Sequence, residues 1–253
     1  KMLLLRDVTE RMRVNRMRRD FVANASHELR SPLTVISGYL GSMAEEGLPD
    51  QWQKPVEQMQ AQAERMNRII AELLDLSRLE VAGRAGLANV VDVASLLAGA
   101  RKAVTGNAGQ AGIEVVTDTE LQLRGNATQI ESVVMNLLSN ALRHTPADGT
   151  VTLAWKARKN GAELSVTDTG EGVAPEHIPR LTERFFRVDR GRARNDGGVG
   201  LGLAIVKHIL HRHDAELRIE SEVGAGSTFR CLFPGERVLA VDGGAEGKQR
   251  RRA

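Results

Sequence analysis

The sequence predicts two domains, an antiparallel helical hairpin followed by an α+β domain. Apolar residues recur every third or fourth position over 11–46 and again over 52–73, as they do along one face of a helix. The stretch 83–88 is rich in small residues and indicates a linker. Beyond it, segments of period-two alternation are interspersed with helical segments, which is typical of an α+β domain.

The composition is that of a folded protein. Of 253 residues, 42% are hydrophobic and 26% are charged, which excludes a disordered or collagen-like chain. The net charge is only +3, and part of the basic excess lies in 248–252, so we expect no nucleic-acid partner. Cys231 is the single cysteine, which excludes an intrachain disulfide and a cysteine metal cluster. No apolar run approaches the ~18 residues that a membrane span needs.

The N-terminal third of the chain carries the helical hairpin. Residues 1–9 are interpreted as the end of an absent upstream sensor domain and its linker. After a break at 47–50, the apolar residues from Trp52 to Leu73 are spaced alternately by four and three, as in a coiled coil. Two helices alone have a narrow core, so the domain 10–82 is expected to dimerise into a four-helix bundle.

The α+β domain is predicted over 89–236, with a disordered tail over 237–253. Gly161 separates two strand-like segments and suggests a hairpin. The strands expected from alternation are 151–155, 164–166, 218–222 and 228–233, and the expected helices are 130–144 and 199–213.

His27 lies on the first predicted helix, two residues from both Ala25 and Leu29 of the apolar stripe. At about 100° per residue it points about 160° away from each, toward solvent. An exposed histidine alone is usually without function. Its neighbours are more informative, because they read Phe21-Val22-Ala23-Asn24-Ala25-Ser26-His27-Glu28-Leu29-Arg30-Ser31-Pro32-Leu33-Thr34.

Four further motifs follow in the α+β domain. Asn136 and Asn140 share one helical face, with Arg143 and His144 one turn later. The other three are rich in glycine: Asp168-Thr169-Gly170-Glu171-Gly172, Gly197-Gly198-Val199-Gly200-Leu201-Gly202-Leu203 and Gly224-Ala225-Gly226-Ser227-Thr228-Phe229. The segment that begins at Gly197 opens a helix, whose unpaired N–H groups can hold a phosphate. Each motif alone has an ordinary explanation, as a polar helix face or a turn, but their joint order and spacing does not.

Taken together, these motifs resemble a known family. The residues around His27 resemble the phosphoacceptor box of sensor histidine kinases. The four later motifs resemble the nucleotide-binding boxes of the ATPase superfamily that these kinases share with gyrase, heat-shock chaperones and mismatch-repair ATPases. Glu183-Arg184-Phe185-Phe186-Arg187 resembles the phenylalanine box of the kinases. The resemblance covers about 10–236, and among these kinases the chain is most similar to the phosphate-regulon sensor kinases. It implies a two-layer α+β sandwich for the ATPase domain.

The resemblance also implies roles for individual residues. His27 would attack the γ-phosphate of ATP, Glu28 would orient its ring, and Ser31 would position water for dephosphorylation of a response regulator. Asn140 would ligate Mg²⁺, and Asp168 would accept a hydrogen bond from the adenine amino group. The other nucleotide-binding residues that it implies are Asn136, Arg143, His144, Gly170, Gly172, Phe186, Arg187, Gly198, Gly200, Leu201, Gly202 and Thr228.

Three residues depart from the family pattern. Val199 stands where threonine is common, which removes a hydroxyl near the phosphates, and Ser31 stands where threonine or asparagine is usual. Asn126 replaces a common aspartate before the asparagine helix, and we interpret this as an exchange of one helix-capping residue for another.

The partners implied by the resemblance are ATP with Mg²⁺, a second copy of the chain and the receiver domain of a response regulator. The full-length protein is expected in the bacterial inner membrane, anchored by absent upstream segments, with this fragment in the cytoplasm. Two alternatives remain at this point: an ATP-driven conformational clamp without a phosphoenzyme, and a pseudokinase scaffold. The acceptor box argues against the clamp, and the complete set of nucleotide motifs argues against the pseudokinase.

Overall fold

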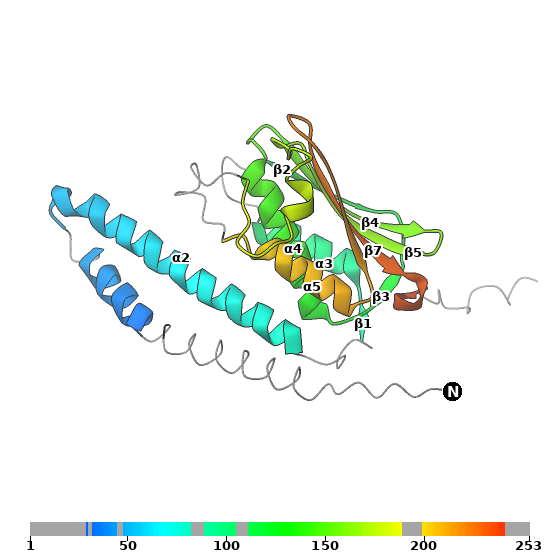
Figure 1. Ribbon diagram of the computed structural model, residues 1–253, viewed down its shortest axis with the longest axis horizontal. Coiled ribbons are helices and arrows are strands. Elements are labelled where there is room, and N and C mark those ends of the chain that lie inside the picture. The colour runs from blue at the N-terminus through cyan, green and yellow to red at the C-terminus, as the bar shows by residue number, and fades with distance from the viewer. Residues whose placement is uncertain are drawn as a thin grey trace, which may run out of the picture. The chain divides into compact units, whose positions relative to one another are not determined.

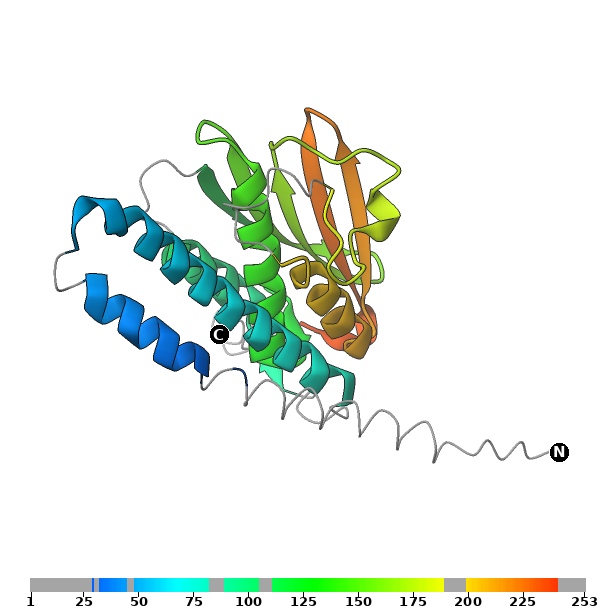
Figure 2. The same cartoon turned by 60° about the vertical axis from the view of Figure 1, so that its left-hand side comes forward.

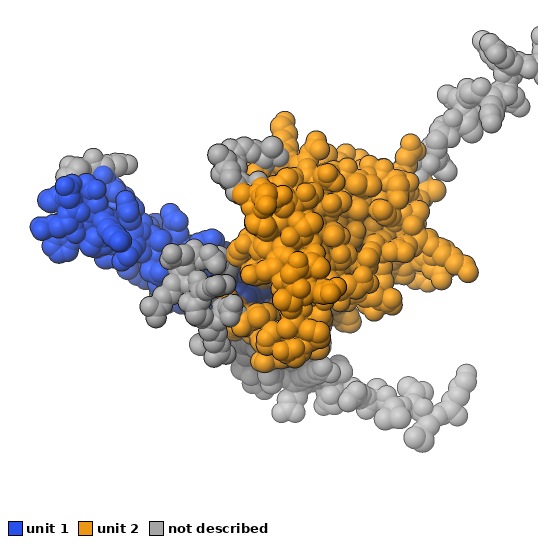
Figure 3. Space-filling model, turned by 90° about the horizontal axis from the view of Figure 1, so that it is seen from above, with its two compact units in different colours: residues 1–83, 191–201 blue, residues 84–190, 202–253 orange. Residues whose placement is uncertain are grey.

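The chain divides into two compact units, Lys1–Gly83 with Gly191–Leu201 and Arg84–Arg190 with Gly202–Ala253 (Figure 3). The computed structural model describes residues 29, 32–44, 48–81, 89–104, 111–188 and 199–240 (Figure 1). No helix in these described ranges combines the length and the apolar character needed to cross a membrane.

The first unit contains a helical hairpin. A helix over 32–44 lies beside the long helix α2 (Asp50–Val81), as Figures 1 and 2 show. Their shared core is apolar and is formed by Leu33, Leu40, Val56, Ala63, Ile70 and Leu74. Gln60 adds a hydrogen bond between the two helices, from its Nε2 to the carbonyl oxygen of Leu40 (3.1 Å). The part of the first predicted helix before residue 29 lies outside the described residues, as do residues 30 and 31.

The apolar positions of α2 fall into two sets with a seven-residue spacing. Val56, Ala63 and Ile70 are buried in the hairpin core. Trp52, Met59 and Met66 are 54%, 45% and 48% exposed. The shorter helix repeats this division, because Leu33 and Leu40 are buried whereas Ile36 and Met43 are exposed. Half of the predicted heptad seam therefore closes the hairpin, and the other half forms an outward-facing stripe.

The second unit is a two-layer α+β sandwich. Its five-stranded sheet has the order β2-β4-β5-β7-β6, and only the β2–β4 pair is parallel. The helices pack on one face, with α3 on β2 and β4, α4 on β4 and β5, and α5 on β6 (Figure 2). The elements are α3 (Val93–Val104), α4 (Ala127–His144), α5 (Gly202–Arg212), β2 (Gly112–Thr117), β4 (Thr150–Arg158), β5 (Gly161–Asp168), β6 (Glu216–Glu222) and β7 (Gly226–Pro234). This is the fold class that the resemblance implies.

The predicted hairpin around Gly161 is confirmed as β4 and β5. The two-residue turn Lys159-Asn160 leads into Gly161, whose φ is +145°. Strand β5 lies at the centre of the sheet, and most of its residues are buried on both faces. The buried Glu163 on this strand is compensated by ion pairs with Arg158 and Arg230. On the neighbouring strand β7, Cys231 is fully buried, and burial raises the pKa of its thiol.

A second, three-stranded sheet has the order β1-β3-β8. It contains β1 (Val90–Val91), β3 (Gln122–Arg124) and β8 (Val238–Leu239). The predicted domain end at residue 236 is therefore too early, because β8 pairs with β3 beyond it. Two short 3₁₀ helices, η1 (Ile178–Arg180) and η2 (Gly235–Arg237), complete the described elements. In η2, Arg237 forms an ion pair with Asp214 (2.7 Å).

The ends of the two helices over β5 and β6 differ from the predicted bounds. Helix α4 begins three residues earlier than expected, because Asn126 accepts a hydrogen bond from the backbone N–H of Gln129 (3.0 Å) and caps it. This confirms the interpretation of Asn126 as a capping residue. Helix α5 begins at Gly202 rather than at residue 199, and Gly200 before it has a φ of +77°, outside the helical region.

His213 joins the C-terminal end of α5 to the start of α4. Its Nε2 accepts a hydrogen bond from the Asn126 N–H (3.2 Å), and its Nδ1 donates to the Ile209 carbonyl (2.8 Å). The ring is fully buried, and this burial lowers its pKa, assisted by the charges of Arg237 and Arg212.

Candidate functional site

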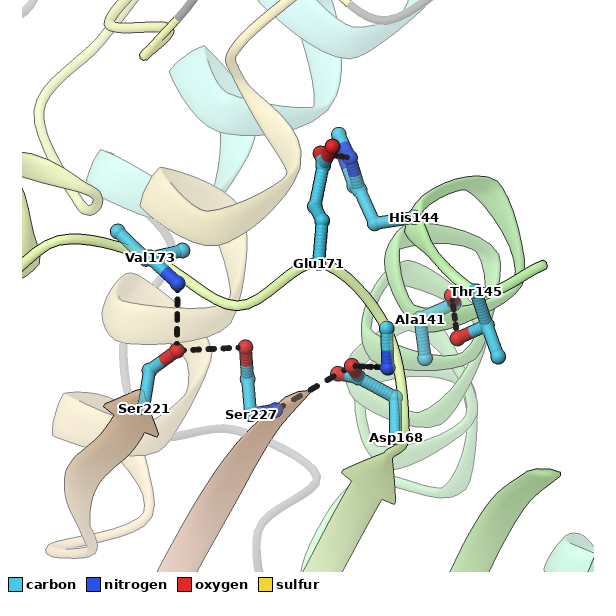
Figure 4. A network of polar contacts seen from close by, with 9 residues as sticks. Ala141, His144, Thr145, Asp168, Glu171, Val173, Ser221 and Ser227 are labelled. Carbon is cyan, nitrogen blue, oxygen red and sulfur yellow. Dashed lines mark hydrogen bonds and ion pairs between the residues drawn. The ribbon is translucent and has the colours of Figure 1, made fainter. Parts of the chain in front are cut away.

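Asp168 lies at the end of β5, beside the last turn of α4. Its carboxyl is buried, and its Oδ1 accepts hydrogen bonds from the N–H groups of Gly170 (2.9 Å) and Ser227 (3.2 Å), as Figure 4 shows. Burial raises the pKa of Asp168, while the two N–H groups and the charge of His144 oppose that rise. The carboxyl is therefore held at one oxygen in a fixed orientation.

The turn after Asp168 is packed closely against its surroundings. Gly172 has a φ of +65°, and a Cβ atom there would lie 1.9 Å from the Glu222 carbonyl oxygen. A Cβ atom at Gly170 would lie 2.2 Å from the His144 carbonyl oxygen. Both glycines are consequently required for the approach of this turn to α4 and to the β6–β7 hairpin.

His144 is bound by this turn. Its Nδ1 lies 2.7 Å from Oε1 of Glu171, and the Glu171 N–H donates to the His144 carbonyl oxygen (3.2 Å). The resemblance implies that His144 approaches a phosphate, whereas here its ring is held by a carboxylate. Arg143, the residue before it, is exposed.

Asn136 brings the middle of α4 to the first turn of α5. Its Nδ2 donates to the Ser132 carbonyl oxygen (2.8 Å). A Cβ atom at Gly202 would lie 2.6 Å from Asn136 Oδ1, so any larger residue there would require the Asn136 side chain to move. The unpaired N–H groups at the start of α5 thus lie next to an amide oxygen, and they form a local concentration of hydrogen-bond donors for an anion. Asn140 lies one turn farther along α4 and is half-buried.

Two family models match the chain. Residues 17–81 match the His Kinase A (phospho-acceptor) domain, and residues 125–237 match the histidine kinase-, DNA gyrase B- and HSP90-like ATPase. The phosphate regulon sensor protein PhoR of Pseudomonas aeruginosa is 46% identical over 245 residues, which cover 95% of this chain and 55% of PhoR. The chain belongs to the sensor histidine kinases.

Further relatives of this histidine kinase agree with the assignment. The sensor-like histidine kinase SenX3 of Mycolicibacterium smegmatis is 38% identical over 90% of this chain and 60% of SenX3. The kinase thus spans little more than half the length of these curated relatives. The crystal structure of full-length ShkA in complex with AMPPNP has a TM-score of 0.71 at 24% identity, covering 88% of this chain and 47% of ShkA, and shows the same fold. The match to a phospho-acceptor domain favours a kinase over the ATP-driven clamp.

In this kinase Thr228 does not lie beside Asp168. Neighbouring residues of a strand point to opposite faces, and Thr228 Oγ1 lies 3.2 Å from Oγ1 of Thr167. Ser227 is the residue opposite Asp168 in the β5–β7 register. Ser227, and not Thr228, is therefore the residue of this motif that contacts Asp168, and the role of Thr228 at the nucleotide stays a prediction. The glycine motif located this segment, but only the strand register identifies Ser227 as the contact.

Ser221 is a further residue that the sequence did not reveal. Its Oγ accepts a hydrogen bond from the N–H of Val173 (2.8 Å) and lies 2.9 Å from Oγ of Ser227 (Figure 4). It fastens the far end of the glycine turn to β6. No motif marks it, because an isolated serine in a charged strand has no distinctive pattern.

Phe186 is half-buried and packs against η1. The Arg180 guanidinium lies 4.3 Å from the centroid of its ring, and the His177 ring lies 6.0 Å away. Arg187 is also half-buried, and Leu201 is fully buried. The described contacts of Phe186 are with η1 and not with the turn that holds Asp168. Four expected site residues, His27, Glu28, Ser31 and Gly198, lie outside the described residues.

The amide oxygen of Asn140 is of the type that a magnesium ion accepts when it is bound largely through phosphate. Across the described ranges, no three side chains of His, Cys, Asp or Glu are placed together to hold a metal ion. Mg²⁺ needs only one or two protein oxygens when substrate phosphates and waters supply the others. The Asn140 amide offers such an oxygen one turn from Asn136.

Proposed function

We propose that this kinase core binds ATP in the α+β domain, phosphorylates His27 and passes the phosphoryl group to an aspartate of a response regulator. The observation that carries the proposal is the buried Asp168 carboxyl, fixed at Oδ1 by two backbone N–H groups. The match of 17–81 to a phospho-acceptor domain supports the assignment of the acceptor.

Asp168 is suited to recognise adenine. An ionised carboxylate only accepts hydrogen bonds, so it pairs with a 6-amino group and not with the 6-oxo group of hypoxanthine or guanine. With Oδ1 held by the protein, Oδ2 is the oxygen that would accept from the base. Gly170 and Gly172 allow the backbone to come close to the same base.

The start of α5 would bind the phosphates. Its N–H groups and positive dipole end attract an anion, and Gly202 leaves room beside Asn136. Asn140 would hold Mg²⁺, which when bound neutralises developing negative charge during phosphoryl transfer. Gly198, Gly200 and Leu201 belong to the segment that leads into α5 and would line the same channel.

The transfer itself would take place at His27. A neutral ring nitrogen forms a bond to the γ-phosphorus while the bond from phosphorus to the bridging oxygen of ADP breaks. Glu28 would hold the N–H of the other ring nitrogen and thereby fix the tautomer. The phosphoramidate then passes its phosphoryl group to the receiver aspartate. Ser31 would position the water molecule that dephosphorylates the regulator.

The outward-facing stripe of the hairpin supports a dimer. Trp52, Met59 and Met66 continue the seven-residue spacing of a coiled-coil seam while remaining about half exposed. A second copy would cover this stripe and complete a four-helix bundle. Anchoring of the full-length protein in the membrane, with this fragment in the cytoplasm, stays a prediction.

Incubation of the purified chain with γ-labelled ATP tests the proposal. We expect a protein-bound label that is acid-labile and alkali-stable, as a phosphoramidate is. His27→Gln should abolish the label while leaving ATP affinity within a few-fold of wild type, because acceptor and nucleotide site lie in different domains. Label retained by His27→Gln would refute the assignment of the nucleophile.

A further inference from the structure

Glu171 connects the turn after β5 to elements on both sides of it. Its backbone N–H donates to the His144 carbonyl oxygen on α4 (3.2 Å), and its own carbonyl oxygen accepts from the Gly224 N–H (2.8 Å). Its side chain reaches back to α4, where Oε1 lies 2.7 Å from His144 Nδ1 (Figure 4). Glu171 thereby holds the turn between α4 and the β6–β7 hairpin.

This ion pair contributes little to the stability of the fold. The side chains of His144 and Glu171 are 42% and 64% exposed. Exposed pairs of this kind contribute little to the free energy of unfolding, because water screens them and two side chains must be ordered. A role in placing the turn is therefore a better explanation of the contact than a role in folding.

The turn that Glu171 holds determines where the Asp168 carboxyl points. One of the two N–H groups on Oδ1 belongs to Gly170, the residue immediately before Glu171. Both His144 and Glu171 are also close enough for their charges to act on the Asp168 carboxyl. A displacement of the turn would move the Gly170 N–H and with it the carboxyl, while the start of α5 would stay in place.

We propose that Glu171 and His144 form a positioning pair that directs Asp168 at the purine base and sets the preference for a 6-amino over a 6-oxo purine. This inference rests on the proposed function. With the side-chain contact removed, the bond from the Glu171 N–H is the one described hydrogen bond that still joins the turn to α4, while the bonds to the β6–β7 hairpin remain. Discrimination between a 6-amino and a 6-oxo purine requires the Asp168 carboxylate to lie within hydrogen-bond distance of the group at position 6. This discrimination is therefore more sensitive to a displacement of the turn than phosphate binding is.

The test compares variants that remove the contact with variants that preserve it. Glu171→Ala and His144→Ala remove it. Glu171→Gln keeps an acceptor for the Nδ1–H, and His144→Asn keeps an N–H donor near the position of Nδ1. Glu216→Ala is the matched control, because it removes an exposed pair with Arg218 (61% and 59% exposed) that does not contact the turn.

Dissociation constants for ATP and inosine triphosphate are measured on the full chain with Mg²⁺. Each alanine variant at the pair should reduce the preference for ATP about five-fold, or about 1 kcal/mol, with inosine triphosphate bound as in wild type. The double alanine variant should be no worse than either single variant, and Glu171→Gln, His144→Asn and Glu216→Ala should keep most of the preference.

Three results would overturn the inference: an unchanged preference in the alanine variants, an equal loss for both nucleotides, or a Gln variant as impaired as the Ala variant. Failure of the proposed function has a different signature. In that case the wild type itself would show no ATP binding, or no preference for ATP over inosine triphosphate.

Discussion

The two oxygens of the Asp168 carboxyl have different tasks. Among the described residues, the hydrogen bonds to this side chain come from Gly170 and Ser227, and both reach Oδ1. The protein thereby fixes the plane of the carboxyl through one atom and leaves the other to a ligand. A buried acceptor placed in this way discriminates well, because a ligand lacking the matching donor leaves it unpaired.

Asp168→Asn tests this division directly. The Asn Oδ1 would keep both backbone hydrogen bonds, so Nδ2 would occupy the position of Oδ2 and present a donor to the 6-amino donor of adenine. ATP affinity should fall about ten-fold or more, since an unpaired polar contact costs about 1–3 kcal/mol. Inosine triphosphate should bind at least as well as to wild type. Calorimetric titration measures both, and ATP bound as tightly as by wild type would contradict the assignment.

His213 makes the stability of the ATPase domain dependent on pH. Its folded pKa lies below the ordinary value of about 6.5, so the unfolded chain binds the proton first as pH falls. The stability that neutral His213 contributes is fully present above the pKa of this histidine in the unfolded chain. It is lost as the pH falls through that pKa toward the lower pKa of the folded state. The free energy of unfolding should thus decline between about pH 7.5 and about pH 5.5.

The control for His213 is a side chain that does not titrate. His213→Gln keeps an acceptor for the Asn126 N–H, so the variant should fold while showing a shallower decline over the same range. Urea unfolding at each pH gives the comparison. Parallel pH curves for wild type and variant would show that His213 is not the group responsible.

Ser227 shows which part of the site could not be predicted from the sequence at the scale of single residues. A glycine turn before a strand predicted that this segment joins the nucleotide site, and the structure places it beside Asp168. Which of two adjacent residues faces Asp168 depends on the β5–β7 register. That register is formed between strands about 60 residues apart, so local pattern did not distinguish Ser227 from Thr228.

At the scale of elements, helix α2 divides its apolar residues between two tasks. Ala63 is buried against the helix over 32–44, and Met59, four residues earlier, is exposed. The spacing of three and four predicted the whole seam, because both sets follow the same helical period. It did not separate the sets, since the direction of the partner helix is a tertiary property. Strands β1 and β3 were not predicted, because two or three residues are too few to show a period.

Charge introduced into the exposed set should prevent dimerisation. Met59→Glu would place a carboxylate in the apolar seam between two copies, where burial of an unpaired charge is unfavourable. Sedimentation equilibrium of the full chain should show a dimer for wild type and a monomer for Met59→Glu. Ala61→Glu is the control, because this exposed residue lies about 160° around the helix from Met59. A dimeric Met59→Glu variant would exclude the stripe from the interface.

At the scale of the whole molecule, the ATPase domain is completed by residues at its C-terminal boundary. Composition placed the end of the domain at residue 236, because the segment beyond it is rich in glycine and basic residues. The structure adds Arg237, which pairs with Asp214, and β8, which pairs with β3. Strand β8 has only two residues, so its pairing depends on β3 and is invisible to local pattern.

Two truncations measure what this boundary contributes. A chain ending at residue 240 should unfold at the temperature of the full chain. A chain ending at residue 236 should unfold several degrees lower, since each 1 kcal/mol lost shifts the midpoint by roughly 2–4 °C in a domain of this size. Scanning calorimetry resolves such a difference. Equal midpoints for the two truncations would mean that Arg237 and β8 are dispensable.

Cys231 provides a native reporter of transient opening of the ATPase domain. It is the single cysteine of the chain and lies fully buried on β7, between β5 and β6. A thiol-reactive reagent can reach it only when the sheet opens, so the rate of labelling measures how often the ATPase domain opens. A nucleotide that binds only the folded domain slows this labelling by mass action. One native sulfur atom can thus report the occupancy of a nucleotide site elsewhere in the domain.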